Sequence, residues 1–214
     1  MTGSIIYVSS NRETPEFEAK IIKDLLSKSN GLPIVSVTHK PVDLGFNICV
    51  GDVGTSGYNF CRQVLMACEN SDSDYVISAE SDCLYSPDYF TFVPPRLDVP
   101  YRNTNIYVQG RPYGTFYRKK GSTFSQVVNR QFYIDRLKGL FGNAPQWDTT
   151  LKNWPKEWGK KLFNEFEYFK TDYPCLSFKT GLGMRSHSPH GETRWHKLPY
   201  WGDTLELIQK YETK

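Results

Sequence analysis

The most constraining feature of this 214-residue sequence is an alternation of apolar strands and amphipathic helices over its first 85 residues. Short apolar runs at 5–10, 33–38 and 75–79 have the composition of buried strands, and helical periodicity lies between them. Strands that alternate with helices pair in parallel through right-handed crossovers. The pattern therefore predicts an α/β fold with a mostly parallel sheet flanked by helices.

Capping signals set the limits of the two predicted helices. Thr14 is a suitable N-cap, Pro15 suits the first helical position, and Asn30-Gly31 ends the first helix. A Gly-rich loop over 51–57 leads into the second helix, which we expect over 58–69. The first helix carries an apolar stripe at helical spacing, formed by Phe17, Ile21, Ile22, Leu25 and Leu26.

After residue 95 the regular alternation is lost. Asp203 would cap a last helix that has Leu205 and Ile208 on its buried side. Since the length suits one domain, we expect 1–95 and 96–214 to be two halves of it. The predicted elements of the second half are strands at 105–109, 113–118 and 174–179 and helices over 125–141, 156–169 and 203–211.

Composition narrows the class of protein only a little. Lys and Arg number 26 against 23 Asp and Glu, and the net charge of +3 does not by itself indicate a nucleic-acid binder. The basic, aromatic stretch RPYGTFYRKK at 111–120 suits either a polyanion or a solvated face. Five cysteines without a C-x-x-C pair, and no apolar run of about 18 residues, predict a cytoplasmic protein with reduced thiols and no integral membrane contact.

Two carboxylates stand at the end of the third predicted strand, in Glu80-Ser81-Asp82. In a parallel sheet, ligands bind outside the carboxyl ends of the strands. Mn²⁺ and Mg²⁺ prefer oxygen ligands and often combine one or two carboxylates with substrate phosphates. A lone E-x-D is common by chance, but its place at a strand end favours a metal and phosphate site.

Four segments together resemble GT-A glycosyltransferases, in particular small family-two-like enzymes that use nucleotide sugars. The resemblance covers residues 1 to 95 and implies a GT-A (Rossmann-like) fold with a C-terminal acceptor-side elaboration. It implies a nucleoside-diphosphate sugar as donor, here a UDP-sugar, with Mn²⁺ or Mg²⁺ as cofactor. The segments are YVSSNR at 7–12, PIVSVTHK at 33–40, GDVGTSGYN at 51–59 and DYVISAESDCLY at 74–85.

The resemblance implies specific site residues. Glu80 and Asp82 would hold the metal, and one of His187 and His190 would be a further metal ligand; a solvated His-rich loop or a zinc pair are the alternatives. Thr38-His39-Lys40 lacks the acid that often meets the base, so the donor base stays open. The residues that would contact the donor are Ser9, Ser10, Asn11, Arg12, Gly54, Asn59, Glu80 and Ser81, with Gln63 as a weak addition; an ordinary helix entry explains several of them equally well.

An inverting transferase also needs a base beside the acceptor hydroxyl. Asp148, which follows Trp147, is the candidate, with Glu165 and Glu167 as competitors on a predicted helix. With its basic segment, the second half also resembles that of phage-type enzymes that glycosylate hydroxylated bases in DNA. This resemblance implies a hydroxymethylated base in duplex DNA as the acceptor, in a host cytoplasm if the protein is phage-encoded; a saccharide or a small molecule is the alternative. The competing functions are a nucleotidyltransferase, which would need a Gly-rich basic loop after the first strand, and a noncatalytic nucleic-acid or carbohydrate binder.

Overall fold

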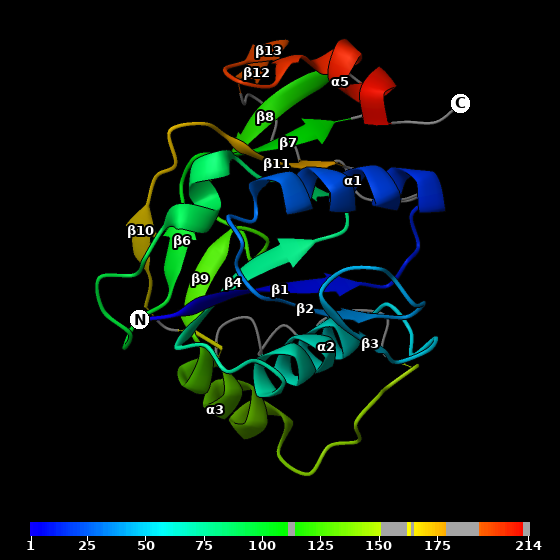
Figure 1. The fold of residues 1–214 in the computed structure, drawn as a ribbon, viewed down its shortest axis with the longest axis vertical. Coiled ribbons are helices and arrows are strands. Elements are labelled where there is room, and N and C mark those ends of the chain that lie inside the picture. The colour runs from blue at the N-terminus through cyan, green and yellow to red at the C-terminus, as the bar shows by residue number, and fades with distance from the viewer. Residues whose placement is uncertain (111–113, 151–161, 164, 179–192, 212–214) are drawn as a thin grey trace.

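The computed structural model describes residues 1–110, 114–150, 162–163, 165–178 and 193–211. A large sheet runs through its centre (Figure 1). The four strands at one end of this sheet, β4, β1, β2 and β3, are all parallel, whereas β9 is antiparallel to β4. In spatial order the strands are β10 (Glu167–Phe169), β6 (Tyr101–Asn103), β9 (Gln126–Asn129), β4 (Tyr75–Glu80), β1 (Gly3–Ser9), β2 (Ile34–Thr38) and β3 (Phe46–Cys49).

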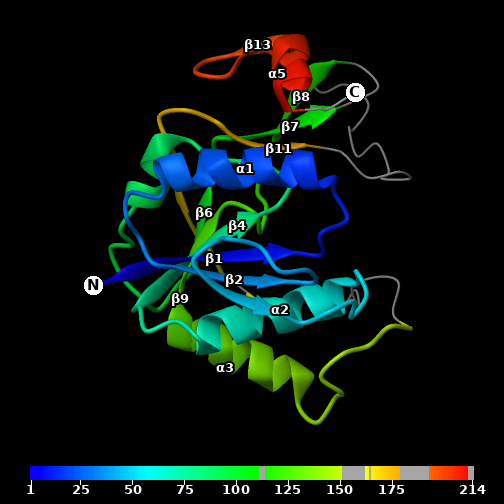
Figure 2. The same cartoon turned by 45° about the vertical axis from the view of Figure 1, so that its right-hand side comes forward.

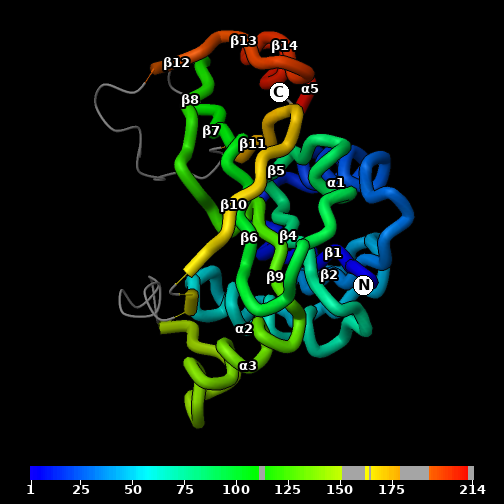
Figure 3. Tube along the Cα trace, turned by 90° about the vertical axis from the view of Figure 1, so that its left-hand side faces the viewer, coloured from blue at the N-terminus to red at the C-terminus, as the bar shows by residue number. Residues whose placement is uncertain are grey.

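A second, smaller sheet lies on the far side of helix α1 (Pro15–Lys28). Its order is β12 (Arg194–Trp195), β8 (Thr115–Lys119), β7 (Ile106–Gly110), β11 (Cys175–Phe178) and β5 (Cys83–Leu84). A hairpin of β13 (Lys197–Leu198) and β14 (Gly202–Asp203) and helix α5 (Thr204–Tyr211) complete this end of the molecule (Figure 3).

Helices cover both faces of the large sheet. Helices α2 (Gly57–Glu69) and α3 (Arg130–Phe141) pack on one face, where Ile6 and Val8 of β1 point, and a short 3-10 helix, η1 (Pro87–Thr91), follows β5. Helix α1 packs on the other face through Leu25 and on the small sheet through Phe17 and Ile21. The predicted α/β fold with a mostly parallel sheet and flanking helices is confirmed. No described helix is long and apolar enough to cross a bilayer.

The capping signals act as the sequence predicts. The Thr14 hydroxyl accepts a hydrogen bond from the Phe17 backbone N–H at 3.3 Å, which begins α1. Asn30 and Gly31 follow α1 with φ angles of 54° and 71°, a left-handed turn that ends the helix. The Ser56 hydroxyl caps α2 in the same way, by accepting from Asn59 N–H.

Four sequence predictions are wrong, and three of them concern the second half. Residues 126–129 form strand β9 rather than the start of a helix, because they pair with β4 and only Asn129 caps α3. Residues 167–169 form strand β10 beside β6 rather than a helix end; most of the rest of that predicted helix lies outside the described residues. Leu26 and Leu205 are exposed, whereas Leu207 and Tyr211 form the buried side of α5.

All five cysteines lie within the described residues and none is in a disulfide. Four of them are buried and Cys49 is exposed. Burial raises the pKa of Cys61, Cys68, Cys83 and Cys175, which keeps these thiols protonated. They act as small core side chains.

Candidate functional site

The four parallel strands β1 to β4 end on one edge of the large sheet, the edge that comes forward in Figure 2. The loops after β1 and β4 meet the first turn of α2 there and enclose a hollow of about 120 Å³. Of the residues predicted to contact the donor or metal, Ser9, Ser10, Arg12, Glu80, Ser81 and Asp82 all line this hollow. We call it the rim pocket; its other lining residues are Val8, Thr55, Ser56, Phe60 and Gln63.

The carboxylates of the rim pocket stand on a fixed backbone. Glu80 is the last residue of β4, and its backbone N–H donates to the hydroxyl of Tyr85 at 3.0 Å. The backbone carbonyl of Asp82 accepts from the Phe178 N–H at 2.7 Å. Both carboxylates are half-buried. The large sheet and the small sheet therefore both hold this turn in place.

The ligand atoms at this turn fit a hard divalent cation. One oxygen each from Glu80 and Asp82 and the sulfur of Cys83 lie within 4.8 Å of one another. Burial raises the pKa of the Cys83 thiol well above its usual value, and the thiol donates to Asp82 Oδ1 at 3.3 Å. A protonated thiol is a poor metal ligand. The two carboxylates are thus the groups that suit Mn²⁺ or Mg²⁺, and Cys83 positions one of them.

A buried carboxylate organises the loop after β1. Glu18 in α1 is 5% exposed, and its two oxygens accept from the Tyr7 hydroxyl at 2.8 Å and from Asn11 Nδ2 at 2.9 Å. The side-chain oxygen of Asn11 then accepts from Lys40 N–H at 2.7 Å, across to the loop after β2. Asn11 has φ 47°, and its own N–H donates to Ser9 Oγ at 2.9 Å. We call this series of hydrogen bonds, from Tyr7 through Glu18 and Asn11 to Lys40, the Glu18 relay.

The Glu18 relay changes the interpretation of Asn11. The sequence predicts that Asn11 contacts the donor, but both ends of its amide bind protein groups, and Asn11 does not line the rim pocket. Its observed role is to join two loops. The sequence signal for Glu18 was misleading, because an acid in the first turn of a helix is normally explained by the helix dipole.

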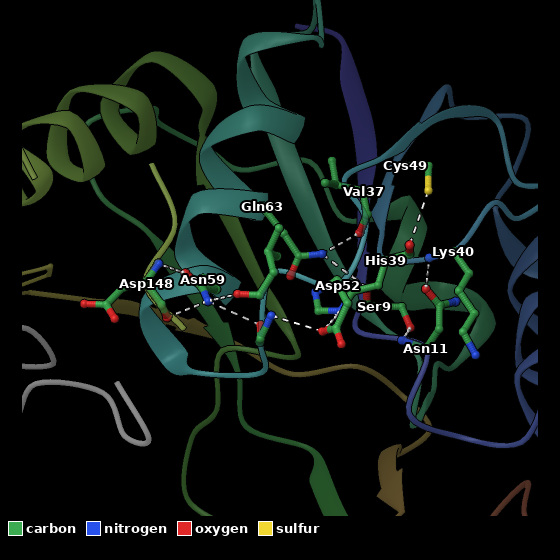
Figure 4. Close-up of polar contacts among 12 residues, drawn as sticks. Ser9, Asn11, Val37, His39, Lys40, Cys49, Asp52, Asn59, Gln63 and Asp148 are labelled. Atoms are coloured by element: carbon green, nitrogen blue, oxygen red, sulfur yellow. Dashed lines mark hydrogen bonds and ion pairs between the residues drawn. The ribbon is translucent and has the colours of Figure 1, made fainter. Parts of the chain in front are cut away.

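Gln63 fastens α2 to the ends of two strands. Its side-chain Nε2 donates to the Ser9 carbonyl at 3.2 Å and to the Val37 carbonyl at 3.1 Å (Figure 4). The side chain is 3% exposed and lines the rim pocket. Gln63 stands one helical turn after Asn59, and this i, i+4 spacing is the signal that places both on one face of α2.

Asn59 and Asp148 bind each other through the Asn59 side chain. Asn59 Oδ1 accepts from the Asp148 N–H and Asn59 Nδ2 donates to the Asp148 carbonyl, both at 2.9 Å, and Nδ2 also contacts the Val53 carbonyl. The Asp148 carboxylate accepts from Thr150 N–H and hydroxyl at 2.8 and 2.6 Å and points away from Gln63 (Figure 4). Neither residue lines the rim pocket. Asn59 holds a loop, and Asp148 as the base stays a prediction.

Gly54 makes room for the same loop. It has φ +85°, and a Cβ there would lie 3.3 Å from Asn59 Nδ2 and 3.7 Å from Thr149 Cα. A larger residue would therefore strain the backbone and press on the Asn59 side chain. Gly54 does not line the rim pocket, so its observed role is one of packing.

The loop after β2 supplies a buried imidazole. The His39 side chain is 5% exposed, and Nδ1 lies 3.7 Å from Oδ1 of the exposed Asp52. Burial lowers the pKa of His39, an effect that Asp52 partly opposes. Nε2 is buried and has no hydrogen-bond partner among the described residues.

His187 and His190 lie outside the described residues, so their role as metal ligands stays a prediction. The described chain before them ends at Phe178, whose N–H donates to the Asp82 carbonyl. Strand β11 therefore ends against the acidic turn.

Comparison with known proteins gives structural likeness without sequence likeness. No protein-family model and no curated protein sequence matches the chain. Residues 1–349 of TarS from S. aureus align with a TM-score of 0.50 and 12% identity, over 83% of this chain and 60% of the TarS chain. The structure of the same protein with UDP-GlcNAc aligns with a TM-score of 0.50 and 10% identity, over 85% of this chain and 60% of that chain. The mannosyltransferase PcManGT from Pyrobaculum calidifontis, solved with GDP-Man and Mn²⁺, gives a TM-score of 0.47 at 11% identity over 84% and 58%.

Likeness at such low identity concerns the fold. The chain has the α/β arrangement of GT-A glycosyltransferases, in which a mostly parallel sheet is flanked by helices. It spans 60% of the TarS chain, so what that longer protein does belongs to that protein.

Proposed function

We propose that this chain is a metal-dependent glycosyltransferase that moves a sugar from a nucleoside-diphosphate sugar to a hydroxyl group. The observation that carries the proposal is the rim pocket, where the loop after β1, the first turn of α2 and two half-buried carboxylates converge. Ligands of open α/β sheets bind at this edge. The likeness to a protein solved with UDP-GlcNAc supports the fold on which the proposal rests.

Each wall of the rim pocket has a role in the proposal. Glu80 and Asp82 hold Mn²⁺ or Mg²⁺; when bound, the cation neutralises charge that develops on the departing diphosphate. Ser9, Ser10 and Ser81 offer hydroxyl groups to the nucleotide. Arg12, whose side chain is 47% exposed, offers a fork-shaped donor to phosphate.

The first turn of α2 contributes as well. Thr55 and Ser56 line the pocket just before the helix begins, so its positive end faces the bound diphosphate. The reaction breaks the bond from the anomeric carbon to the diphosphate and forms one to the acceptor oxygen. The hydroxyl proton passes to a base, for which Asp148 is the sequence candidate.

The finer parts of the proposal concern donor and acceptor. We propose a UDP-sugar as donor, one of His187 and His190 as a further metal ligand, and a cytoplasmic location. The acceptor is a hydroxymethyl pyrimidine in duplex DNA, and a saccharide is the alternative. Sugar transfer to such DNA, measured with a radiolabelled donor, supports the first; transfer to a saccharide alone contradicts it.

Donor hydrolysis tests the core of the proposal. The protein is incubated with a panel of nucleotide sugars with and without Mn²⁺, and released nucleoside diphosphate is measured. We expect metal-dependent release from one donor and its loss in the Asp82→Asn variant. If no donor in the panel releases nucleoside diphosphate, the result would contradict a transferase and favour a noncatalytic binder.

A further inference from the structure

A second hollow lies on the small sheet, formed by residues of β8 and β12 and their flanking loops. It has a volume of about 340 Å³ and is lined by Thr104, Arg118, Lys120, Thr193 and Trp195. Strands β8 and β12 pair in antiparallel fashion at the edge of the sheet (Figure 3). We call this hollow the basic groove. It shares no lining residue with the rim pocket.

The charge of the basic groove is of one sign. Arg118 and Lys120 are exposed, no acidic residue lines the groove, and neither cation has a carboxylate partner within the described part of the chain. Arg118 uses its Nη2 to donate to the Thr104 carbonyl at 3.3 Å, which fixes the guanidinium beside the groove. Two cations that share one concave surface, without a carboxylate partner among the described residues, attract an anion.

A third cation lies under the turn that follows Lys120. A Cβ on Gly121 would lie 3.9 Å from Arg102 Cδ, so the Arg102 side chain passes beneath this turn. Its guanidinium is 3.5 Å from the centre of the Phe166 ring, and its Nε is buried without a hydrogen-bond partner among the described residues. Arg102 thus adds a third cation beside Gly121, the residue that follows Lys120 of the groove.

The groove also has a fixed aromatic wall. Trp195 is half-buried and stands edge-on to Tyr107, with ring centres 5.4 Å apart and an interplanar angle of 81°. Its strand is fastened to β8 by the pairing Trp195 with Phe116, and Arg194 Nη1 donates to Thr115 Oγ1 at 3.3 Å. The indole is therefore held in one orientation beside the two cations.

We propose that the basic groove binds a strand of nucleic acid, with phosphates on Arg118 and Lys120 and a base against Trp195. Cations that follow a phosphate backbone and an aromatic side chain that stacks a base are the two parts of a single-strand binding surface. An anionic saccharide is less well matched, because the described lining residues offer two threonine hydroxyls and, among them, no Asn, Gln, Asp or Glu for sugar hydroxyls. The use of the basic groove in acceptor recognition rests on the proposed function.

The test measures binding of a fluorescein-labelled oligothymidylate by anisotropy as salt is raised. We expect R118E/K120E to weaken binding by about tenfold or more and to reduce the salt slope by about 1.4, at roughly 0.7 for each phosphate contact. W195A weakens binding with the salt slope unchanged. The matched control is K23E/R136E, which makes the same charge change at exposed positions on α1 and α3 and leaves the slope nearly as in wild type.

Circular dichroism of each variant confirms that it is folded. Equal loss of binding in R118E/K120E and K23E/R136E would show that the basic groove is not the binding site. Binding of a phosphodiester glycan, without binding of the oligonucleotide, would also contradict the proposal. Metal-dependent donor hydrolysis without oligonucleotide binding overturns this inference alone. Binding that depends on the groove without any donor hydrolysis overturns the proposed function alone.

Discussion

The rim pocket and the basic groove are built in different ways. The rim pocket is made by loops that each follow directly from a parallel strand, and buried side chains such as Glu18 and Gln63 join those loops to one another. The basic groove lies on a sheet whose strands come from residues 83 to 195, with exposed cations along its edge. The first is a small, fixed pocket; the second is an open charged surface.

This difference separates two kinds of recognition. A pocket with buried hydrogen-bonded walls selects a ligand by shape, and losing one wall leaves buried groups without partners. An open basic surface binds through charge, so its contribution falls with salt and is shared among several residues. Substitutions at the two regions should therefore differ in size and in salt dependence.

The largest effect is expected at the two carboxylates of the rim pocket. Glu80→Gln and Asp82→Asn should each lower metal-dependent donor turnover by about 100-fold or more, because a charge-neutral amide holds a divalent cation poorly (about 3 kcal/mol). Turnover at several Mn²⁺ concentrations measures this. Asp72→Asn, at an exposed turn, is the matched control. Wild-type turnover in both Glu80→Gln and Asp82→Asn would show that the rim pocket does not hold the metal.

A large effect on stability is expected where the two sheets meet. Asn103 in β6 is fully buried; its side chain donates to the Thr171 hydroxyl at 3.0 Å and accepts from the Asn105 N–H at 2.9 Å. Asn103→Ala should lower the free energy of unfolding by about 2–3 kcal/mol, because the Asn105 N–H stays buried without its partner and the Thr171 hydroxyl keeps only its bond to the Tyr173 carbonyl. Urea denaturation measures it, with the exposed Asn143→Ala as control. An equal midpoint in both variants contradicts it.

The Glu18 relay should have a smaller effect that is confined to the donor side. Glu18→Gln keeps one acceptor oxygen, which can still accept from Asn11, and replaces the other by an amide donor, so the Tyr7 hydroxyl can no longer donate to it. We expect the KM for the donor to rise about tenfold (~1.4 kcal/mol) with a smaller change in kcat. Glu16→Gln, exposed on the same helix, should behave as wild type. A change in kcat alone, with the KM for the donor unchanged, would contradict a role of the Glu18 relay in donor binding.

The smallest effect concerns pH and His39. The folded protein holds His39 at a lowered pKa, whereas the unfolded chain takes up a proton near 6.5. Stability from the neutral imidazole is therefore present above pH 6.5 and is lost as the pH falls through that value. His39→Gln should flatten the fall in the urea midpoint between about pH 7 and about pH 5. An unchanged fall would show that other groups cause it.

The half of the large sheet that holds the rim pocket was predictable, whereas the other half, formed by β9, β6 and β10, was not, for a physical reason. Local periodicity and capping residues predict strands β1, β2 and β4 and helices α1 and α2. Parallel pairing then brings the ends of these strands together. Strand β9 pairs with residues about fifty positions earlier, and its four residues run into α3, so local pattern alone read them as helix. Pairings of that kind are set by tertiary contacts.

The same limit applies within the site. The sequence placed Glu80, Asp82 and the Ser9–Ser10 loop correctly at one edge, because strand ends are local features. The resemblance assigns Asn11, Gly54 and Asn59 to the donor, which stays a prediction; in the structure Asn11 and Asn59 each join two loops, and Gly54 leaves room for the Asn59 side chain. A polar side chain near a strand end has the same sequence signature whether it faces a ligand or the backbone of a neighbouring loop.

The bonds of Gln63 to the ends of β1 and β2 have a consequence for the thermodynamics of binding. Together with the Asn11 bond to Lys40, they hold both loops through contacts within the protein itself. Most of the conformational entropy of these loops is thus lost when the chain folds rather than when a ligand arrives. A ligand that enters the rim pocket keeps more of its interaction energy as affinity, and its arrival need not await a loop rearrangement.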